Sequence, residues 1–205
     1  MRYSGASQKR SPTEFRIPWG SLRFLVILVT LGSWIHLWPA LHAEQPSEYA
    51  LKAEFIERFT RFVDWPEDRV FRTGHDGSFV IGIVGEDPFG PHLQRLARSR
   101  RIKGERIQIH GIIEPEDVVK CQLLFISESE KSRLRAILAQ AGGRPILTIG
   151  DTPGFAEAGV LINFYLDGDR IRFEINETAF ARSGLHVDTK LLKLARVIGS
   201  GEERR

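Results

Sequence analysis

Polar side chains between residues 163 and 174 have the chemistry that best suits recognition. They alternate with apolar residues along two predicted strands, and alternate residues of a strand share one face. Planar guanidinium groups beside a tyrosine ring are typical of protein and ligand recognition surfaces. An ordinary solvent-exposed strand face is the alternative, with Glu174 pointing outward and Asn176 acting only as a helix cap. The predicted binding residues of this face are Asn163, Tyr165, Arg170, Arg172 and Glu174.

A second candidate lies at Trp65, between Asp64 and Pro66. A residue before proline is pushed out of the helical region, so a helix is predicted to end here. A large aromatic side chain at such a point either fills a gap in the core or contributes to a ligand or partner surface. Both interpretations stay open for Trp65.

The sequence contains none of the common catalytic motifs. The patterns G-x-x-x-x-G-K-[ST], G-x-G-x-x-G, G-x-S-x-G and H-E-x-x-H are all missing. The single cysteine, Cys121, excludes an internal disulfide and a cysteine-based zinc site. It lies in an apolar run, which is typical of a buried thiol, with an intermolecular disulfide as the alternative. We therefore predict no metal, no cofactor and no enzyme, although a hydrolase with a scattered site would escape this search.

The first 43 residues have the composition of a cleavable export signal. They contain five of the 29 basic and one of the 26 acidic residues, which leaves 24 basic and 25 acidic residues in the rest. A chain whose residues after position 43 carry almost no net charge is not expected to bind nucleic acid. The apolar stretch 24–38 would span about 22 Å as a helix, short of the roughly 30 Å hydrocarbon core. We expect cleavage after Ala43 and a periplasmic product, with an uncleaved N-terminal membrane anchor as the alternative.

The hydrophobic periodicity of residues 44–199 predicts one α/β domain, followed by a flexible tail at 200–205. Alternating strands and helices favour a parallel sheet, to which the last two strands add an antiparallel edge hairpin. The predicted class is a single-domain sandwich with a mixed sheet of about six strands flanked by helices. Helices are predicted at 49–63, 89–98, 129–139, after an Asn176 N-cap, and at 189–198 after an Asp188 N-cap, where Leu194 is expected to be buried. Strands are predicted at 79–85, 106–112, 122–126, 145–149, 161–166 and 170–175.

The hairpin has a predicted register. A two-residue turn at Asp167-Gly168 would pair Phe164 with Ile171 on the apolar face and Tyr165 with Arg170 on the polar face. A one-residue slip would mix apolar and polar side chains on both faces, so this register is preferred.

The order of several sequence blocks resembles the YfiR family of periplasmic proteins. The resemblance covers nearly all of the chain after residue 43 and implies one α/β domain. The matching blocks are KAEFIERFTRFVDWP (52–66), FVIGIVGEDPFG (79–90), CQLLFIS (121–127), PILTIGDTPGFAEAGVLINF (145–164) and RIRFEINETAFARSGLHVDTKLLKLARVI (170–198).

The resemblance implies regulation. The best-understood relatives bind the periplasmic region of an inner-membrane diguanylate cyclase and repress cyclic-di-GMP synthesis, and an outer-membrane lipoprotein can sequester the repressor. Homodimers and small aromatic or nucleotide-like ligands are associated with that system. Matched residue by residue, the resemblance implies a binding role for Asp64, Trp65, His186, Asp188 and Arg196. Redox control by paired cysteines cannot operate here, and the acidic Asp64 and Asp188 put an anionic-ligand site in doubt.

Two functions follow from these observations. The first is a periplasmic, non-enzymatic regulator that binds the extracytoplasmic domain of a diguanylate cyclase or a sensor kinase. The alternative is a periplasmic binding protein for a small aromatic or nucleotide-like molecule that feeds a sensor kinase, with its ligand near Trp65 and the C-terminal block 170–198. Because Trp65 is the only tryptophan after residue 38, ligand-dependent quenching of its fluorescence would distinguish the two.

Overall fold

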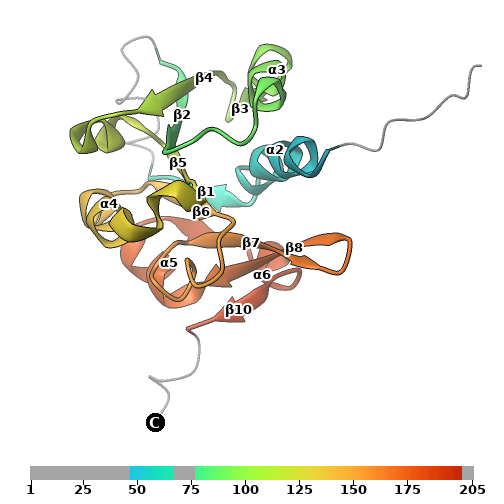
Figure 1. Cartoon of the computed structure of the whole chain (residues 1–205), viewed down its shortest axis with the longest axis vertical. Helices are drawn as coiled ribbons and strands as arrows, with labels where there is room; N and C mark the ends of the chain where they lie inside the picture. The colour runs from blue at the N-terminus through green and yellow to red at the C-terminus, as the bar shows by residue number, and fades with distance from the viewer. Residues whose placement is uncertain (1–46, 67–76, 200–205) are drawn as a thin grey trace, which may run out of the picture. The chain divides into compact units, whose positions relative to one another are not determined.

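The computed structural model describes residues 47–66 and 77–199 (Figure 1). The predicted export signal and the predicted C-terminal tail lie outside these residues. Within the described ranges, no helix is both long enough and apolar enough to span a bilayer. The elements are α2 (Glu48–Phe59), β1 (Val63–Asp64), β2 (Phe79–Val84), α3 (Pro91–Ser99), β3 (Arg101–Ile102), β4 (Glu105–Ile112), η2 (Pro115–Lys120), β5 (Leu123–Ile126), η3 (Glu128–Arg133), α4 (Leu134–Ala141), β6 (Leu147–Gly150), β7 (Ile162–Asp167), β8 (Arg170–Asn176), α5 (Glu177–Ser183), β9 (His186–Val187), α6 (Thr189–Leu192) and β10 (Arg196–Ile198).

An eight-stranded mixed sheet in the order β10-β8-β7-β6-β5-β2-β4-β3 forms the centre of the fold. Neighbours from β4 to β7 are parallel, and β8 returns antiparallel to β7. A separate two-stranded sheet pairs β1 with β9. The predicted mixed α/β class is confirmed, and two short strands, β3 and β10, extend the sheet beyond the six that the sequence predicted.

Helices cover both faces of this sheet. One face carries the larger apolar cluster, which includes Phe59 of α2, Leu93 of α3 and Phe125 of β5. On the other face, Leu124 of β5 packs in a second cluster with Ile137 of α4. All six residues of β2 are buried, as expected for a parallel strand that is covered on both sides.

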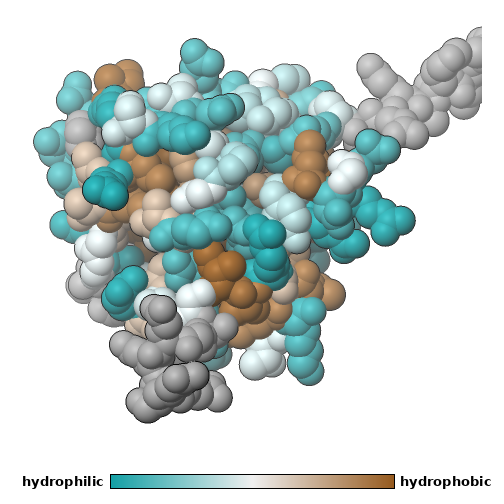
Figure 2. Space-filling view, turned by 60° about the horizontal axis from the view of Figure 1, so that its bottom comes forward, coloured by the Kyte–Doolittle hydropathy of each residue, from teal (hydrophilic) through white to brown (hydrophobic). Residues whose placement is uncertain are grey.

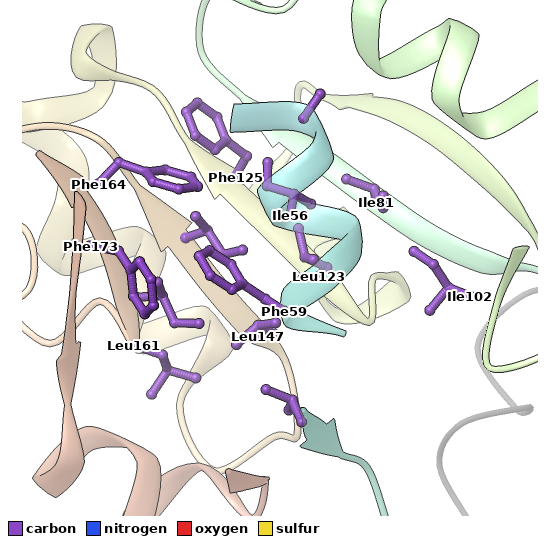
Figure 3. Close-up of a cluster of buried hydrophobic side chains, with 14 of the residues drawn as sticks. Ile56, Phe59, Ile81, Ile102, Leu123, Phe125, Leu147, Leu161, Phe164 and Phe173 are labelled. Carbon is purple, nitrogen blue, oxygen red and sulfur yellow. The ribbon is translucent and has the colours of Figure 1, made fainter. Parts of the chain in front are cut away.

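Helix α2 is held against the sheet by aromatic packing (Figure 3). The ring of Phe59 lies 5.5 Å from that of Phe164 and 4.8 Å from that of Phe173, measured between centroids. The predicted helix is too long at its C-terminal end, because residues 60–62 form turns and Val63 pairs with Val187 of β9. The chain therefore leaves the helix before it reaches Trp65.

The observed hairpin register differs from the predicted one by two residues. Phe164 of β7 pairs with Phe173 of β8 rather than with Ile171. The turn consists of Gly168 and Asp169, and Gly168 has a φ of 59°, which glycine adopts without strain. Because a shift of two residues preserves side-chain alternation, the apolar and polar faces keep their predicted composition.

The predicted last helix is wrong beyond its first turn. α6 ends at Leu192, and Arg196–Ile198 form β10, parallel to β8. The hairpin is therefore not at the edge of the sheet, because β10 hydrogen-bonds the outer side of β8. Leu194, predicted to be buried in the helix, is 69% exposed. Side-chain N-caps are confirmed at Asn176 and Asp188.

Candidate functional site

The observed register places Glu174 at the centre of the predicted polar face. Glu174 pairs with Asn163 of β7 on one side and with Arg196 of β10 on the other. Asn163 Nδ2 donates a hydrogen bond to Glu174 Oε1 over 3.2 Å, and Arg196 Nε donates to Glu174 Oε2 over 3.0 Å. Arg196 Nη2 donates to the same carboxylate oxygen. Three of the predicted site residues therefore form one hydrogen-bonded row across three strands.

This row is anchored in the protein interior, since Glu174 is 2% and Asn163 1% exposed. A buried carboxylate needs charged or hydrogen-bonding partners, and each oxygen of Glu174 has one. Asn163 Nδ2 also donates to the carbonyl oxygen of Thr152 over 3.0 Å. Asn163 Oδ1 and Thr152 Oγ1 are buried without a hydrogen-bond partner among the described residues. Asn163 and Glu174 thus support the surface from beneath, and Glu174 is not the outward strand residue of the alternative interpretation.

The accessible part of this face contains half-buried Tyr165 and exposed Arg172 and Arg196, which together we call the arginine–tyrosine surface. The guanidinium of Arg196 lies 4.4 Å from the centre of the Tyr165 ring, within the range of a cation–π contact. Arg172 pairs with Tyr165 across the hairpin, and Arg170 flanks the turn; both are exposed. The hydrogen bond to Glu174 raises the pKa of Arg196, so this residue is a permanent cation. Its side chain is 55% exposed although its guanidinium is held on two sides.

The remaining predicted residues lie around the small β1–β9 sheet. Asp64 pairs with His186, and both are exposed. Trp65 is 7% exposed, donates from Nε1 to the carbonyl oxygen of Gln122 over 3.3 Å, and packs edge-on against Phe79. Trp65 therefore acts in packing, while Asp64 and His186 remain accessible.

Three further contacts, made by Asp64 and Asp188, lie at the ends of this small sheet. The carboxylate of Asp64 accepts a hydrogen bond from Lys103 Nζ over 3.0 Å. Asp188 accepts from the backbone N–H of Lys190, and its own N–H donates to the carbonyl oxygen of Phe62. Asp188 is thus a helix cap, and its backbone also ties α6 to the turn between α2 and β1.

Sequence reasoning missed a buried polar cluster beside the carboxyl end of β6. Lys52 is 4% exposed, and its Nζ donates to Asp151 Oδ2 over 2.7 Å and contacts Glu48 Oε1 at 2.5 Å. The hydroxyl of Tyr49 donates to the same Asp151 oxygen over 3.0 Å. Burial, followed by the charge of Asp151, raises the pKa of Tyr49 well above its usual range. Lys52 and Asp151 are 99 residues apart, so no local pattern signals their pairing.

Cys121 has the properties predicted for a buried thiol. It is 3% exposed and makes no disulfide. Burial raises its pKa to about 12, so it is a poor nucleophile at neutral pH. Among the described residues, no three histidine, cysteine or acidic side chains are arranged to hold a metal ion.

Comparison with known proteins gives one family match and two distant structural likenesses. The model of the family described as YfiR/HmsC-like matches residues 49–196. A crystal structure of a conserved domain protein from Vibrio cholerae O1 biovar El Tor is 12% identical, with a TM-score of 0.47, over 73% of this chain and 60% of that one. The ABC domain from Streptococcus pneumoniae in complex with L-Trp is 8% identical, with a TM-score of 0.45, over 69% and 59% of the two chains. The chain thus spans about 60% of the length of these solved structures.

Proposed function

Because the chain belongs to the YfiR/HmsC-like family, whose members are periplasmic regulators of the diguanylate cyclase pathway rather than enzymes, we propose that it binds the extracytoplasmic region of an inner-membrane signalling protein. The favoured partner is a diguanylate cyclase, which binding would hold in a state of low cyclic-di-GMP synthesis. The alternative partner is a sensor kinase, which is also an inner-membrane signalling protein with an extracytoplasmic region. We also propose that an outer-membrane lipoprotein can sequester this protein and that the protein assembles into a homodimer.

The observation that carries this proposal is the anchored arginine of the arginine–tyrosine surface. Arg196 is held by buried Glu174 and by the ring of Tyr165, so it loses little conformational freedom when a partner binds. Arginine and tyrosine are enriched among the residues that contribute most to binding energy. Arg170, Arg172 and Arg196 outnumber the two carboxylates that contact this surface, Glu174 and Asp167, so the surface carries a net positive charge and suits an acidic patch on the partner.

The test combines capture with a charge reversal that leaves the fold intact. Purified protein carrying Arg172→Glu is compared with Arg135→Glu, a reversal of an exposed arginine on α4. Both variants are immobilised, exposed to detergent-solubilised inner membranes, and the captured proteins are identified by mass spectrometry. We expect Arg172→Glu to lose a membrane diguanylate cyclase or sensor kinase that the wild type and Arg135→Glu retain. Capture of the same signalling protein by all three would place the interface elsewhere, and capture of none would contradict the function itself.

A cellular measurement tests repression separately from binding. Deletion of the gene should raise cyclic-di-GMP, and complementation by the wild type or by Arg135→Glu should lower it again. Complementation by Arg172→Glu should fail, although the variant accumulates to the same level. Unchanged cyclic-di-GMP after deletion would exclude a cyclase as the regulated partner and would leave the kinase.

The second function is a small-ligand site near Trp65 and the C-terminal block, and its Trp65 part gains no support from the geometry. The cavity beside this ring, lined also by Gln122 and Arg144, measures about 40 Å³. Ligand sites of proteins usually measure about 300–1,000 Å³, so this cavity is too small.

A further inference from the structure

Helices α2 and α3 lie side by side over one face of the sheet, and their outward sides are rich in arginine (Figure 1). The starts of the two helices are joined by a hydrogen bond of 3.0 Å between Ser47 Oγ and His92 Nε2. Both helices bury their inner sides in the larger apolar cluster, α2 through Ile56 and α3 through Leu96. We call their shared outer side the helix surface. It is defined by the exposed side chains of Leu51, Arg58, Arg95, Arg98 and Arg100.

The helix surface has more positive charge than the fold neutralises. Residues 48–61 and 91–100, which form the two helices and their ends, contain six basic and three acidic side chains. Each acid already has a cation beside it, in the pairs Glu48–Lys52, Glu57–Arg61 and Glu54–Arg100, the last at 4.0 Å. The side chains of the remaining cations, Arg58, Arg95 and Arg98, have no hydrogen-bond or ion-pair partner among the described residues. Three guanidinium groups are thus left to meet an outside anion.

The positions of these arginines are unfavourable unless an anion neutralises them. Arg95 and Arg98 are three residues apart, so their side chains are neighbours on α3, where like charges destabilise a helix. Arg100 and Arg101 follow in the chain and are also exposed. No acidic residue lies between positions 95 and 101 to offset these four charges. Such repulsion favours contact with a surface that has many negative charges rather than one.

An apolar side chain lies among these charges. Leu51 is 40% exposed, and it lies on the same side of α2 as Arg58, because residues seven apart in a helix share one face. Ser47 and Glu54, which contact α3 and the residue that follows it, belong to this face as well, so the face borders α3. Cationic side chains together with exposed apolar ones are typical of surfaces that contact the headgroup region of a bilayer.

From these unpaired arginines and the neighbouring leucine we infer that the helix surface docks on an anionic lipid bilayer. One basic side chain near such a bilayer strengthens binding about fivefold, so three of them should give roughly a hundredfold. A lipid surface suits these side chains better than a folded protein does. Arg58, Arg95 and Arg98 are held by no contact and would lose their conformational freedom against fixed acidic groups, whereas lipid headgroups can move to meet them.

The helix surface and the arginine–tyrosine surface lie on opposite faces of the sheet. Phe164 and Phe173 pack against α2, so Tyr165 and Arg172, next to them along their strands, point to the other face. Figure 2 turns forward the side that carries α6 and β10, and it shows a hydrophobic patch enclosed by hydrophilic side chains. A protein docked on lipid through α2 and α3 would therefore keep the arginine–tyrosine surface free for a signalling partner. Lipid docking goes beyond the proposed function and can fail separately from it, because vesicles contain no protein.

Binding to vesicles tests the inference. The protein is purified without residues 1–43, because their apolar stretch would bind lipid by itself, and the sheet and both apolar clusters lie entirely within residues 47–199. Vesicles of phosphatidylcholine alone are compared with vesicles that also contain one quarter phosphatidylglycerol, and flotation measures the bound fraction as the lipid concentration is raised. At about 0.1 M salt we expect the anionic vesicles to bind about a hundredfold more tightly. Most of this preference should disappear at about 0.5 M salt, where charges are screened over a shorter distance.

Two double variants with the same net charge locate the contact. Arg95→Gln with Arg98→Gln should weaken binding to the anionic vesicles about twentyfold, with an unchanged midpoint of unfolding in urea. Arg135→Gln with Arg182→Gln removes exposed arginines from α4 and α5 and should change binding by less than about threefold.

Three results would overturn the inference: equal binding to both kinds of vesicle, a loss of less than about twofold in the α3 variant, or equal losses in the two double variants. It would also be overturned if a short DNA duplex bound more tightly than the anionic vesicles in the same buffer, because the helix surface would then recognise nucleic acid.

Discussion

The ion pair between Arg196 and Glu174 should make a measurable contribution to folding stability. Arg196→Ala removes two hydrogen bonds from a carboxylate that is 2% exposed and leaves it with the single bond from Asn163. Loss of one partner from a fully buried ion pair costs about 3–5 kcal/mol. Because the Arg196 side chain is 55% exposed and water can replace part of its contact, we expect the lower figure of about 2–3 kcal/mol.

A double-mutant cycle isolates this contribution. Glu174→Gln removes the charge but keeps an oxygen for Asn163 Nδ2, while its amide N–H takes the place of the oxygen that accepts from Arg196, so it should cost about 1–2 kcal/mol. In the double variant the alanine no longer leaves a buried charge unpaired. The losses of unfolding free energy in the two single variants, added together, should therefore exceed the loss in the double variant by about 1–2 kcal/mol.

Equilibrium unfolding in urea at pH 7 gives the unfolding free energy of the wild type, the two single variants and the double variant. An equal slope of this free energy against urea concentration in all four shows that the compactness of the folded and unfolded states is unchanged. Arg172→Ala serves as the control, because this arginine lies on the same face without contacting a buried charge. Additivity of the two single losses within about 0.5 kcal/mol would refute the coupling. Arg196 would then be an ordinary surface residue rather than an anchored cation.

Three further perturbations follow from contacts in the interior. A Cβ at Gly150 would lie 2.7 Å from the Phe155 ring, so Gly150→Ala should lower the unfolding free energy by about 1–3 kcal/mol. Gly111 has open space around it, so the control variant Gly111→Ala should change the unfolding free energy little, and thermal unfolding compares the two variants. Lys52→Met should cost about 3 kcal/mol in urea unfolding by leaving Asp151 buried without its cation, and much of this should return when Asp151→Asn is added; an undiminished loss in the double variant would contradict the pairing. Cys121 should react with a thiol reagent at pH 8 only as fast as the protein unfolds. Since burial raises the pKa of Cys121 to about 12, the folded protein keeps a proton that the unfolded chain loses from about pH 8.5 upward, so stability should fall between about pH 9 and 12, and less steeply in Cys121→Ala.

The sequence predicted those elements whose signal is local. The strand Phe79–Val84 is an uninterrupted apolar run, and the helix from Glu48 shows a helical period, so both were found with small errors at their ends. The alternation of the hairpin fixed which side chains share a face, but two registers two residues apart preserve that alternation equally well. Gly168, whose positive φ suits the first position of the turn, decided between them. The register matters for mutagenesis, because Ile171 pairs with Leu166, which is 55% exposed, and is itself only half-buried.

The parts that could not be predicted depend on partners far away in sequence. Arg196–Ile198 are equally compatible with a helix end, and they become a strand because β8 offers an unpaired edge 22 residues earlier. Glu174 looks like an outward residue until that strand brings Arg196 beside it. Lys52 was not singled out at all, since its burial in α2 depends on Asp151, 99 residues away in sequence, in addition to Glu48 one turn earlier. In each case long-range pairing overrides a correct local pattern.

The contact of Phe59 with Phe164 and Phe173 also bears on when the chain can fold. Helix α2, the first element of the described chain, packs its Phe59 against aromatic residues of the β7–β8 hairpin, which lies more than a hundred residues later. A polypeptide emerging from its N-terminal end cannot complete the larger cluster before that hairpin has followed, and closing so long a loop is slow. Such a delay would suit the export that residues 1–43 predict, in which a chain crosses the membrane unfolded and folds after it has crossed. A version whose late hairpin is truncated should accordingly remain protease-sensitive wherever it is made.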